Sequence, residues 1–383
     1  MRDKYILTAE SVTEGHPDKL CDTIADRVLD ACLKHDPAAH VACEAMATAG
    51  KIIVAGEITA KRLPDIPAIV CRTVRETGYS CDYEVEAITH DQSGDIAGAV
   101  SQNGQMGAGD QGIMYGFACS ETPQLLPLPV VLAHRLTGLL TNARKTGTIQ
   151  GLGPDGKAQV SVEYRKGRPS RIAAVVVSCQ HDAEKDLDQL RSEITRSVIV
   201  PALRDLYPDP RTEVLINPSG RFVLGGFEAD TGLTGRKLMV DTYGGLVPHG
   251  GGALSGKDAS KVDRSGTYMA RYIAKNIVAA GLAERCTVSL AYAIGRAEPV
   301  AVDIGLHQTG LYSEDLLEQA VRKAFDLTPG GIIRALGLDR PIFAQFCNYG
   351  HFTHQDAPWE QVDRAAALAE ICAAEGRRPS HEG

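Results

Sequence analysis

The sequence predicts an α+β fold made of three similar α/β domains, each with a mostly antiparallel sheet covered by helices on one face. Three observations carry this prediction. The chain has 383 residues, which suffices for two or three domains. Hydrophobic residues make up 44% and charged residues 23%, which is ordinary for a globular protein with cores of normal size. One order of elements then recurs three times: a helix, a pair of strands, a second helix and a closing strand.

The first copy of this order begins with a helix over residues 18–34. This helix follows Pro17, a favourable first-turn residue, and its apolar side chains Leu20, Ile24 and Val28 recur at helical spacing. The other elements expected in this copy are strands over 40–48 and 52–60, a helix over 64–77 and a strand over 83–89.

The second and third copies repeat the order of elements rather than the residues themselves. In the second copy, helices are expected over 130–145 and 183–206, and strands over 158–164, 172–179 and 212–216. In the third copy, helices are expected over 259–282 and 313–325, and strands over 286–294 and 300–306, with an end around 342–349.

These copies divide the chain into an N-terminal domain over 1–102, a central domain over 103–226 and a C-terminal domain over 227–383. Helices cover only one face of each expected sheet, so the other face needs a partner. Sheet faces packed together, or a large dimer interface, would supply it.

Composition excludes several classes of partner. The formal net charge of −8 leaves no global basic field, so we expect no nucleic-acid partner. Residues 1–19 contain no apolar core of a secretory signal, and no apolar run approaches the ~20 residues that span a bilayer, so we expect no membrane association. The 10 cysteines include no Cys-x-x-Cys pair, and free cysteines in a long chain are typical of the reducing cytoplasm.

The most informative stretch is HGGGALSGKDASKVDRS at residues 249–265. Consecutive glycines allow close backbone approach, and Lys257 and Lys261 point to one side of the helix that begins here. With the partial positive charge of a helix start, they suit a chain of phosphates. Most of a Walker A motif also fits, but Asp258 stands where that motif needs Ser or Thr for Mg²⁺, so we reject a P-loop enzyme. The alternative is a glycine-rich surface turn with solvated lysines.

Two further motifs combine polar side chains with a turn. In GHPDK at 15–19, His16 and Asp18 stand at a helix start, where they can hold an anion or a metal; a plain helix cap is the alternative. In GAGDQG at 107–112, Asp110 precedes an apolar strand. The polar segment 92–109 has the composition of a mobile lid, although a plain surface loop has the same composition.

Residues 151–156, GLGPDG, match the Rossmann fingerprint, which needs a strand before it and a helix after it. A helix precedes the match here and a strand follows it, so we reject that interpretation. Asp155 and Lys157 remain as a polar pair on a loop beside a sheet. Further on, Phe222 offers a flat face for a purine, with a core aromatic as the alternative, and Arg236 and Lys237 add two cations.

These motifs fall at the junctions between the repeats and bring both signs of charge together in an acidic protein. Such a combination suits Mg²⁺–polyphosphate chemistry. The cations are His16, Lys157, Arg236, Lys237, Lys257 and Lys261, and the acids are Asp18, Asp110, Asp230 and Asp263.

The motifs GHPDK at 15–19, GAGDQG at 107–112, GLTGRK at 232–237 and DTYGG at 241–245, with the glycine-rich segment, closely resemble those of S-adenosylmethionine synthetases. The resemblance spans residues 5–359. It implies three domains about a pseudo-threefold axis, the substrates ATP and L-methionine, and the cofactors Mg²⁺ (two per site) and K⁺. It also implies a homodimer with shared active sites, often a dimer of dimers, with Glu57 and Lys257 of one site on opposite subunits.

The same resemblance assigns roles to individual residues. The expected contacts to ATP are His16, Asp155, Lys157, Ser219, Arg221, Phe222, Asp230, Arg236, Lys237, Ala253 and Lys257. Those to methionine are Glu57, Gln92, Asp110, Asp230 and Lys261. The expected metal ligands are Asp18 and Asp263 for Mg²⁺ and Glu44 for K⁺. The expected catalytic groups are His16, Lys157, Arg236, Lys237, Lys257 and Lys261.

The implied reaction is attack of the methionine sulfur on C5′ of ATP, followed by hydrolysis of the tripolyphosphate to phosphate and pyrophosphate. A thioether is already a nucleophile, so catalysis must come from alignment and from charge placed on the departing oxygen. We expect His16 and Lys157 near that oxygen. Two alternatives are a kinase or phosphohydrolase, which would release ADP, and a catalytically inactive regulatory binding subunit.

Overall fold

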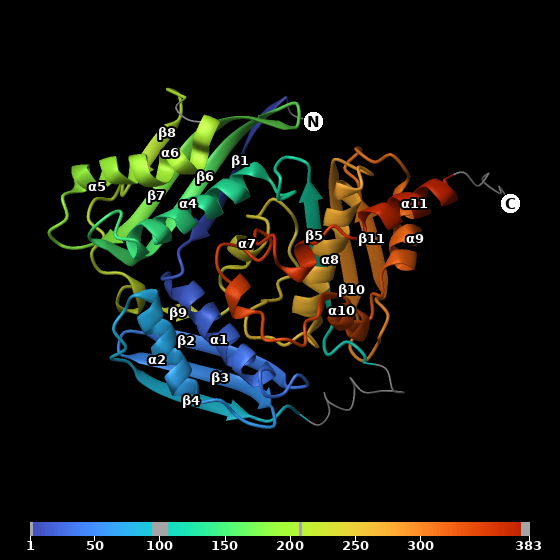
Figure 1. The fold of residues 1–383 in the computed structure, drawn as a ribbon, viewed down its shortest axis with the longest axis horizontal. Helices are drawn as coiled ribbons and strands as arrows, with labels where there is room; N and C mark the ends of the chain where they lie inside the picture. The colour runs from blue at the N-terminus through green and yellow to red at the C-terminus, as the bar shows by residue number, and fades with distance from the viewer. Residues whose placement is uncertain (1–2, 94–105, 207–208, 377–383) are drawn as a thin grey trace.

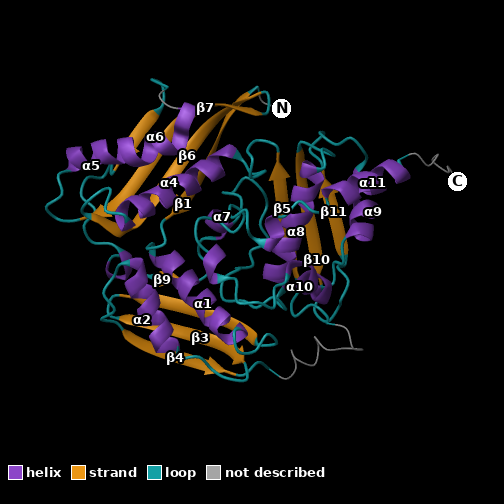
Figure 2. Cartoon of the chain, viewed as in Figure 1, coloured by secondary structure: helices purple, strands orange, loops and turns teal. Residues whose placement is uncertain are grey.

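The computed structural model describes residues 3–93, 106–206 and 209–376. Its three sheets, each flanked by helices, surround a central region that contains the short helix α7 (Leu238–Asp241) (Figure 1). Figure 2 shows that long loops fill the space between the sheets. Most of the segment 92–109, which we expected to be a lid, lies outside the described residues.

The first sheet is built mainly from the N-terminal part of the chain. It is covered by the helices α1 (Pro17–Leu33) and α2 (Ile66–Thr77). Its strands, in spatial order, are β4 (Glu84–His90), β3 (Lys51–Thr59), β2 (His40–Thr48) and β9 (Gly232–Leu233). β3 and β4 are parallel, and the other pairs are antiparallel. Leu20, Ile24 and Val28 of α1 are fully buried, as their helical spacing predicts.

The second sheet forms the central unit, with the long helix α4 (Leu128–Lys145) packed on β1 and β6. Its strands, in spatial order, are β1 (Lys4–Val12), β6 (Leu152–Arg165), β7 (Arg168–His181) and β8 (Glu213–Ile216). The GLGPDG match lies at the start of β6, and the next element is another strand, which confirms that it is no Rossmann fingerprint.

The third sheet is held by α8 (Val262–Ala279), which packs on β5 and β10. Its strands, in spatial order, are β11 (Ala301–Gly305), β10 (Arg285–Tyr292) and β5 (Gly112–Cys119). The remaining helices of this unit are α9 (Glu314–Ala324), α10 (Pro329–Leu336) and α11 (Ala365–Glu375). Neither α10 nor β1 was predicted from the sequence.

Each sheet takes one strand from another segment of the chain. β1 pairs with β6 of the central unit, β5 pairs with β10 of the C-terminal unit, and β9 pairs with β2 of the N-terminal unit. These exchanges tie the three units together, and they bring the segments that follow β1, β5 and β9 toward the centre of the molecule.

One expected helix differs from the structure. The single helix expected over 183–206 is divided into α5 (Leu187–Ile194), a π-helical turn Thr195–Ile199, α6 (Val200–Leu203) and a 3₁₀ turn Arg204–Leu206. Pro201 lacks a backbone N–H and its ring clashes with the preceding turn, which accounts for the irregular geometry there.

Ion pairs are buried where α8 meets its neighbours. Arg264 of α8 binds both carboxylate oxygens of Asp26 on α1, at 2.6 and 2.8 Å, and both side chains are fully buried. Arg271 and Lys275, also on α8, bind Glu360 at 2.7 and 2.6 Å. Buried charges are stable only when they are paired, so these contacts fix α8 against α1 and the C-terminal segment.

The expectation of free cysteines throughout the chain is wrong for one pair. Cys71 of α2 and Cys81 in the following loop form a disulfide, whose sequence separation is only 10 residues. The other eight cysteines are free and buried. None of the described helices has the length and hydropathy that crossing a bilayer requires.

Candidate active site

The start of α1 is shaped by the GHPDK motif. Pro17 occupies the first turn, and Nδ1 of the N-cap residue His16 accepts a hydrogen bond from the backbone N–H of Asp18 at 3.2 Å. This acceptor role leaves the proton of the neutral ring on Nε2. Burial, together with the charges of Lys237 and Lys157, lowers the pKa of His16 to about 3. The ring is therefore a neutral Nε2–H donor at physiological pH.

Asp18 gathers a group of cations from the GLTGRK segment. Its Oδ1 accepts hydrogen bonds from Nε of Arg236 at 2.9 Å and from the backbone N–H of Leu233 at 3.0 Å. Its Oδ2 accepts one from Nζ of Lys237 at 2.6 Å. Burial opposes ionisation, but these donors together lower the pKa of Asp18. Two motifs that are far apart in the sequence thus form one charged site.

Asp155 and Lys157 reach this site from β6. Lys157 pairs in register with Val12, and its charge acts on His16. Asp155 is buried and accepts a hydrogen bond from the backbone N–H of Gly226 at 3.0 Å. Burial raises the pKa of Asp155, and the charge of Asp230 raises it further. The structure therefore brings both residues of the polar pair to the start of α1.

Phe222 is held next to the end of β7. Its backbone N–H donates to Nε2 of His181 at 3.0 Å, and its C=O accepts from the backbone N–H of His181 at 2.9 Å. Its side chain is half-buried and is not a core aromatic. Gln180 links this segment to the site, because its side chain binds the N–H of Asp155 at 3.2 Å and the C=O of Val223 at 3.1 Å.

The glycine-rich segment folds as a turn that leads into α8, with Lys261 as its N-cap residue. Nζ of Lys257 lies 2.7 Å from Oδ2 of Asp263, and Nζ of Lys261 lies 2.5 Å from Oδ2 of Asp258. Asp258, which excluded a Walker A motif, also accepts a hydrogen bond from the N–H of Val41 at 2.6 Å. It therefore ties the turn to β2 rather than holding a nucleotide.

Glycine is required where this segment passes the start of α8. A Cβ atom on Gly252 would lie 2.1 Å from Oδ1 of Asp263. The segment also touches GLTGRK, since a Cβ on Gly235 would lie 2.7 Å from Cβ of Ala253. The close approach explains the glycines in both motifs.

Glu44 and Glu57 lie beside Lys257 in the same chain. The backbone of Lys257 bridges to Ala42 of β2, whose other neighbour in the sheet is Glu57. Burial raises the pKa of Glu44, and the charge of Lys257 opposes that shift. Glu57 and Lys257 of one chain therefore lie on the two sides of Ala42 in the same sheet.

The charged residues form two groups. The His16 group consists of His16, Asp18, Asp155, Lys157, Arg236 and Lys237. The Lys257 group consists of Glu44, Glu57, Lys257, Asp258, Lys261 and Asp263. Across residues 3–93, 106–206 and 209–376, no side-chain hydrogen bond or ion pair joins the two groups. Each chain thus presents two half-sites.

Several predicted residues have only local contacts. The backbone N–H of Gln92 donates to Oγ1 of Thr59 at 2.9 Å, and Oδ1 of Asp110 accepts from its neighbour Gln111 at 2.7 Å. Ser219 and Arg221 are exposed, and the guanidinium of Arg221 donates to the C=O of Ala183 at 3.1 Å. None of these hydrogen bonds joins Gln92, Asp110, Ser219 or Arg221 to the His16 group or the Lys257 group, and their assigned roles stay predictions.

Sequence reasoning missed the buried acids that hold the site loops on α1. Asp22 accepts a hydrogen bond from the N–H of Gly235 at 2.9 Å, and Asp26 accepts one from the N–H of Gly256 at 2.8 Å. With Asp18, they recur every four residues along one face of α1. That spacing was the available signal.

The donor set fits a metal that is completed by substrate. Mg²⁺ usually binds one or two protein carboxylates together with waters and phosphate oxygens. Asp18 and Asp263 each offer one carboxylate beside lysines that suit phosphates. No cluster of three or more His, Cys, Asp and Glu side chains that could cage a metal occurs in the described part of the chain.

Three α/β units with paired acids and cations on glycine-rich turns define a nucleotide-dependent enzyme. Models of the N-terminal, central and C-terminal domains of S-adenosylmethionine synthetase match residues 4–101, 105–222 and 224–361. The chain is 51% identical over 389 aligned positions to the S-adenosylmethionine synthase of Thermus thermophilus, covering 96% of this chain and 98% of the relative. It is 50% identical over 386 positions to that of Desulforudis audaxviator, covering 95% and 98%.

The chain therefore belongs to the S-adenosylmethionine synthetase family, whose members are ATP-binding methionine adenosyltransferases. Divalent metal ions are typical of this family. The predicted family and the predicted α+β fold of three domains are confirmed.

Proposed function

We propose that the protein forms S-adenosylmethionine from ATP and L-methionine by direct attack of the sulfur on C5′, and then hydrolyses the tripolyphosphate to phosphate and pyrophosphate. The observation that carries this proposal is the His16 group, in which a neutral Nε2–H donor stands beside Lys157 and Lys237. Such a group stabilises a departing phosphate oxygen by hydrogen bonding and charge, as this displacement requires.

No residue has to act as a general base in the first step, because the thioether sulfur carries a free electron pair. What the chain must supply is alignment of the sulfur with C5′ and charge at the leaving oxygen. His16 donates through Nε2 and keeps its proton, since its low pKa makes the neutral form persist across the working pH range. Lys157 adds a positive charge at the same place.

The ion pairs of the two half-sites differ in how readily they can exchange a partner. Lys257 and Asp263 are 20% and 19% exposed, so both reach solvent. Lys237 is 15% exposed but Asp18 only 2%, and Asp18 keeps its hydrogen bonds from Arg236 and from the N–H of Leu233 when Lys237 leaves. Asp18 and Asp263 would hold two Mg²⁺, which when bound neutralise phosphate charge. The two lysines would then turn to the phosphates.

The remaining contacts are assigned by motif. We assign Ser219, Arg221, Phe222, Asp230, Arg236 and Ala253, with Asp155, to ATP. We assign Glu57, Gln92, Asp110 and Lys261, with Asp230, to methionine, and Glu44 to K⁺. The half-burial of Phe222 supports a stacking role, because its ring keeps a free surface.

Two half-sites in each chain support a homodimer in which the His16 group of one subunit faces the Lys257 group of the other. A two-fold dimer then has two complete sites. We propose that these dimers pair further into a dimer of dimers, that the three domains divide near residues 102 and 226, and that the protein acts in the cytoplasm.

The test is an assay with ATP, L-methionine, Mg²⁺ and K⁺, in which products are identified by mass and by phosphorus resonance. We expect S-adenosylmethionine, phosphate and pyrophosphate in equal amounts. Release of ADP would instead identify phosphoryl transfer. Accumulation of free tripolyphosphate would overturn the second step alone.

A further inference from the structure

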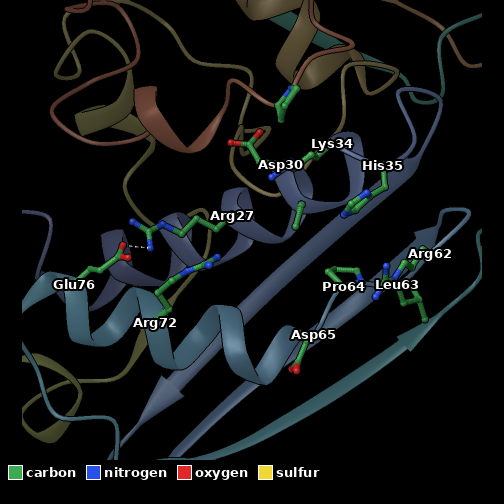
Figure 3. Close-up of a pocket in the computed structure, with 12 residues that line it drawn as sticks. Arg27, Asp30, Lys34, His35, Arg62, Leu63, Pro64, Asp65, Arg72 and Glu76 are labelled. Carbon is green, nitrogen blue, oxygen red and sulfur yellow. Dashed lines mark hydrogen bonds and ion pairs between the residues drawn. The ribbon is translucent and has the colours of Figure 1, made fainter.

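A groove outside both half-sites lies between the C-terminal half of α1 and α2 (Figure 3). Its volume is about 800 Å³, within the range of small-molecule sites. The lining residues of α1 run from Arg27 to Lys34, which places them about 14–24 Å along the helix from Asp18 in its first turn, at 1.5 Å per residue. The groove is therefore separate from the active site.

The acids that line this groove are already engaged within the protein. Glu76 binds Nη1 of Arg27 at 2.5 Å. Asp65 caps α2 by accepting from the N–H of Ala68 at 3.0 Å. Asp30 accepts from two backbone N–H groups, those of Phe343 and Ala344, at 3.0 and 2.9 Å.

Three cations on the groove have no such partner. The exposed side chains of Lys34, Arg62 and Arg72 make no hydrogen bond or ion pair with any described residue. They come from the end of α1, from the loop before α2 and from α2 itself. Figure 3 shows Arg72 extending from α2 toward Arg27 on α1, with Arg62 on the loop at the far end. The unsatisfied charge of the groove is therefore positive, although the protein as a whole is acidic.

The lining of the groove is partly apolar. The apolar part of its lining is formed by Leu63 and Pro64 in the loop before α2, with Ala31 and Pro341 from other segments, and Leu63 is 53% exposed. A large exposed apolar side chain next to unpaired cations suits a ligand with an organic part and an anionic part. Two guanidinium groups favour phosphate, because each can form two parallel hydrogen bonds to its oxygens.

We propose that this groove is a second binding site, for a small phosphate-bearing ligand such as a nucleoside phosphate. The phosphates pair with free cations that line the groove, and the organic part covers Leu63, which neighbours Arg62.

The experiment is titration calorimetry of the full-length protein with pyrophosphate, which both the active site and the groove can bind. We expect two classes of site in the wild-type protein. The double variant Arg62→Ala/Arg72→Ala should lose one class, with at least a tenfold fall in its affinity. Arg75→Ala is the matched control, because Arg75 is exposed on the same helix but does not line the groove.

The activity of the same variants distinguishes the two sites. The double variant should keep S-adenosylmethionine synthesis within twofold of wild type, since neither residue belongs to a half-site. A single class of site in the wild type, unchanged binding in the double variant, or a parallel loss of binding and activity would each overturn the proposal. Tighter binding of a hexaglutamate peptide than of pyrophosphate, lost in the same variant, would overturn it in favour of an acidic peptide.

Discussion

Two ion pairs on the same helix, α8, have the same length but different surroundings. Nε of Arg271 lies 2.7 Å from Glu360, and Nζ of Lys257, in the turn before the helix, lies 2.7 Å from Asp263. The first pair is 0% and 1% exposed, and the second is 20% and 19% exposed. A buried charge cannot lose its partner without large cost, whereas a pair near water can exchange its partner for a ligand. For these two pairs, burial and not distance distinguishes the scaffold from the site.

The buried cation Arg271 also has more hydrogen-bond partners than Lys257. Arg271 also donates to the C=O groups of Phe117, Gln124 and Leu125, and Glu360 also binds Lys275. Every donor direction of this guanidinium is thus engaged. Among the described residues, Nζ of Lys257 has one hydrogen-bond acceptor, Asp263, and its other donors remain for phosphate oxygens.

The largest expected effect is on the buried pair. Glu360→Gln keeps the shape of the side chain but leaves Arg271 and Lys275 as unpaired buried cations. We expect the free energy of unfolding to fall by about 3–5 kcal/mol, measured by urea unfolding at fixed protein concentration. Glu318→Gln is the control, because Glu318 forms an exposed pair with Arg322 and should change stability by less than about 0.5 kcal/mol. Equal losses of unfolding free energy in the two variants would contradict the difference between buried and exposed ion pairs.

The next effect concerns the pair near solvent. Lys257→Met should leave unfolding unchanged but should lower kcat/KM by about 100- to 1000-fold, since it removes about 3–4 kcal/mol of charge stabilisation. Lys323→Met, which removes an exposed lysine bound to Glu375, should leave activity unchanged. If the activity of Lys257→Met stayed within a fewfold of wild type, Lys257 would not belong to the active site.

The repeat of elements was readable from the sequence because each helix and strand carries its own periodicity. Strand β2, for example, was predicted with its observed bounds, His40–Thr48. The exchange of β1, β5 and β9 between sheets was not readable, because pairing between distant strands leaves no periodic signal in either one. The broken helix around Pro201 shows how one residue overrides a helical pattern.

The site was readable where polar residues stand on glycine-rich turns, as His16 and Lys257 do. Contacts between motifs, such as that of Asp18 with Lys237, depend on the tertiary fold and could not be derived from spacing. Buried partners were the hardest to find. Asp26 and Arg264 are 238 residues apart, and each looks like an ordinary surface charge when the sequence alone is considered.

A smaller effect on stability comes from His134, a buried histidine that stays neutral in the folded protein. His134 is buried on α4 against Ser11 and Thr137, and burial lowers its pKa to about 3. The unfolded chain takes up a proton near pH 6.5 and the folded protein does not, so this residue's contribution to stability is lost as pH falls below 6.5. Between about pH 6.5 and 4.5 the wild type should lose about 2 kcal/mol more than His134→Asn, measured by urea unfolding at both values. Parallel losses would show that His134 titrates normally in the fold.

The smallest effect tests whether the two half-sites meet between subunits. His16→Asn and Lys257→Met should each be inactive as homodimers, because each damages one half of every site. In a mixed dimer whose sites join the His16 group of one chain to the Lys257 group of the other, one site collects both lesions and the other has none. Mixed dimers purified through two different tags should therefore have about half the wild-type activity. If both groups of a site came from one chain, every site would keep one lesion, and the mixed dimers would be as inactive as either parent.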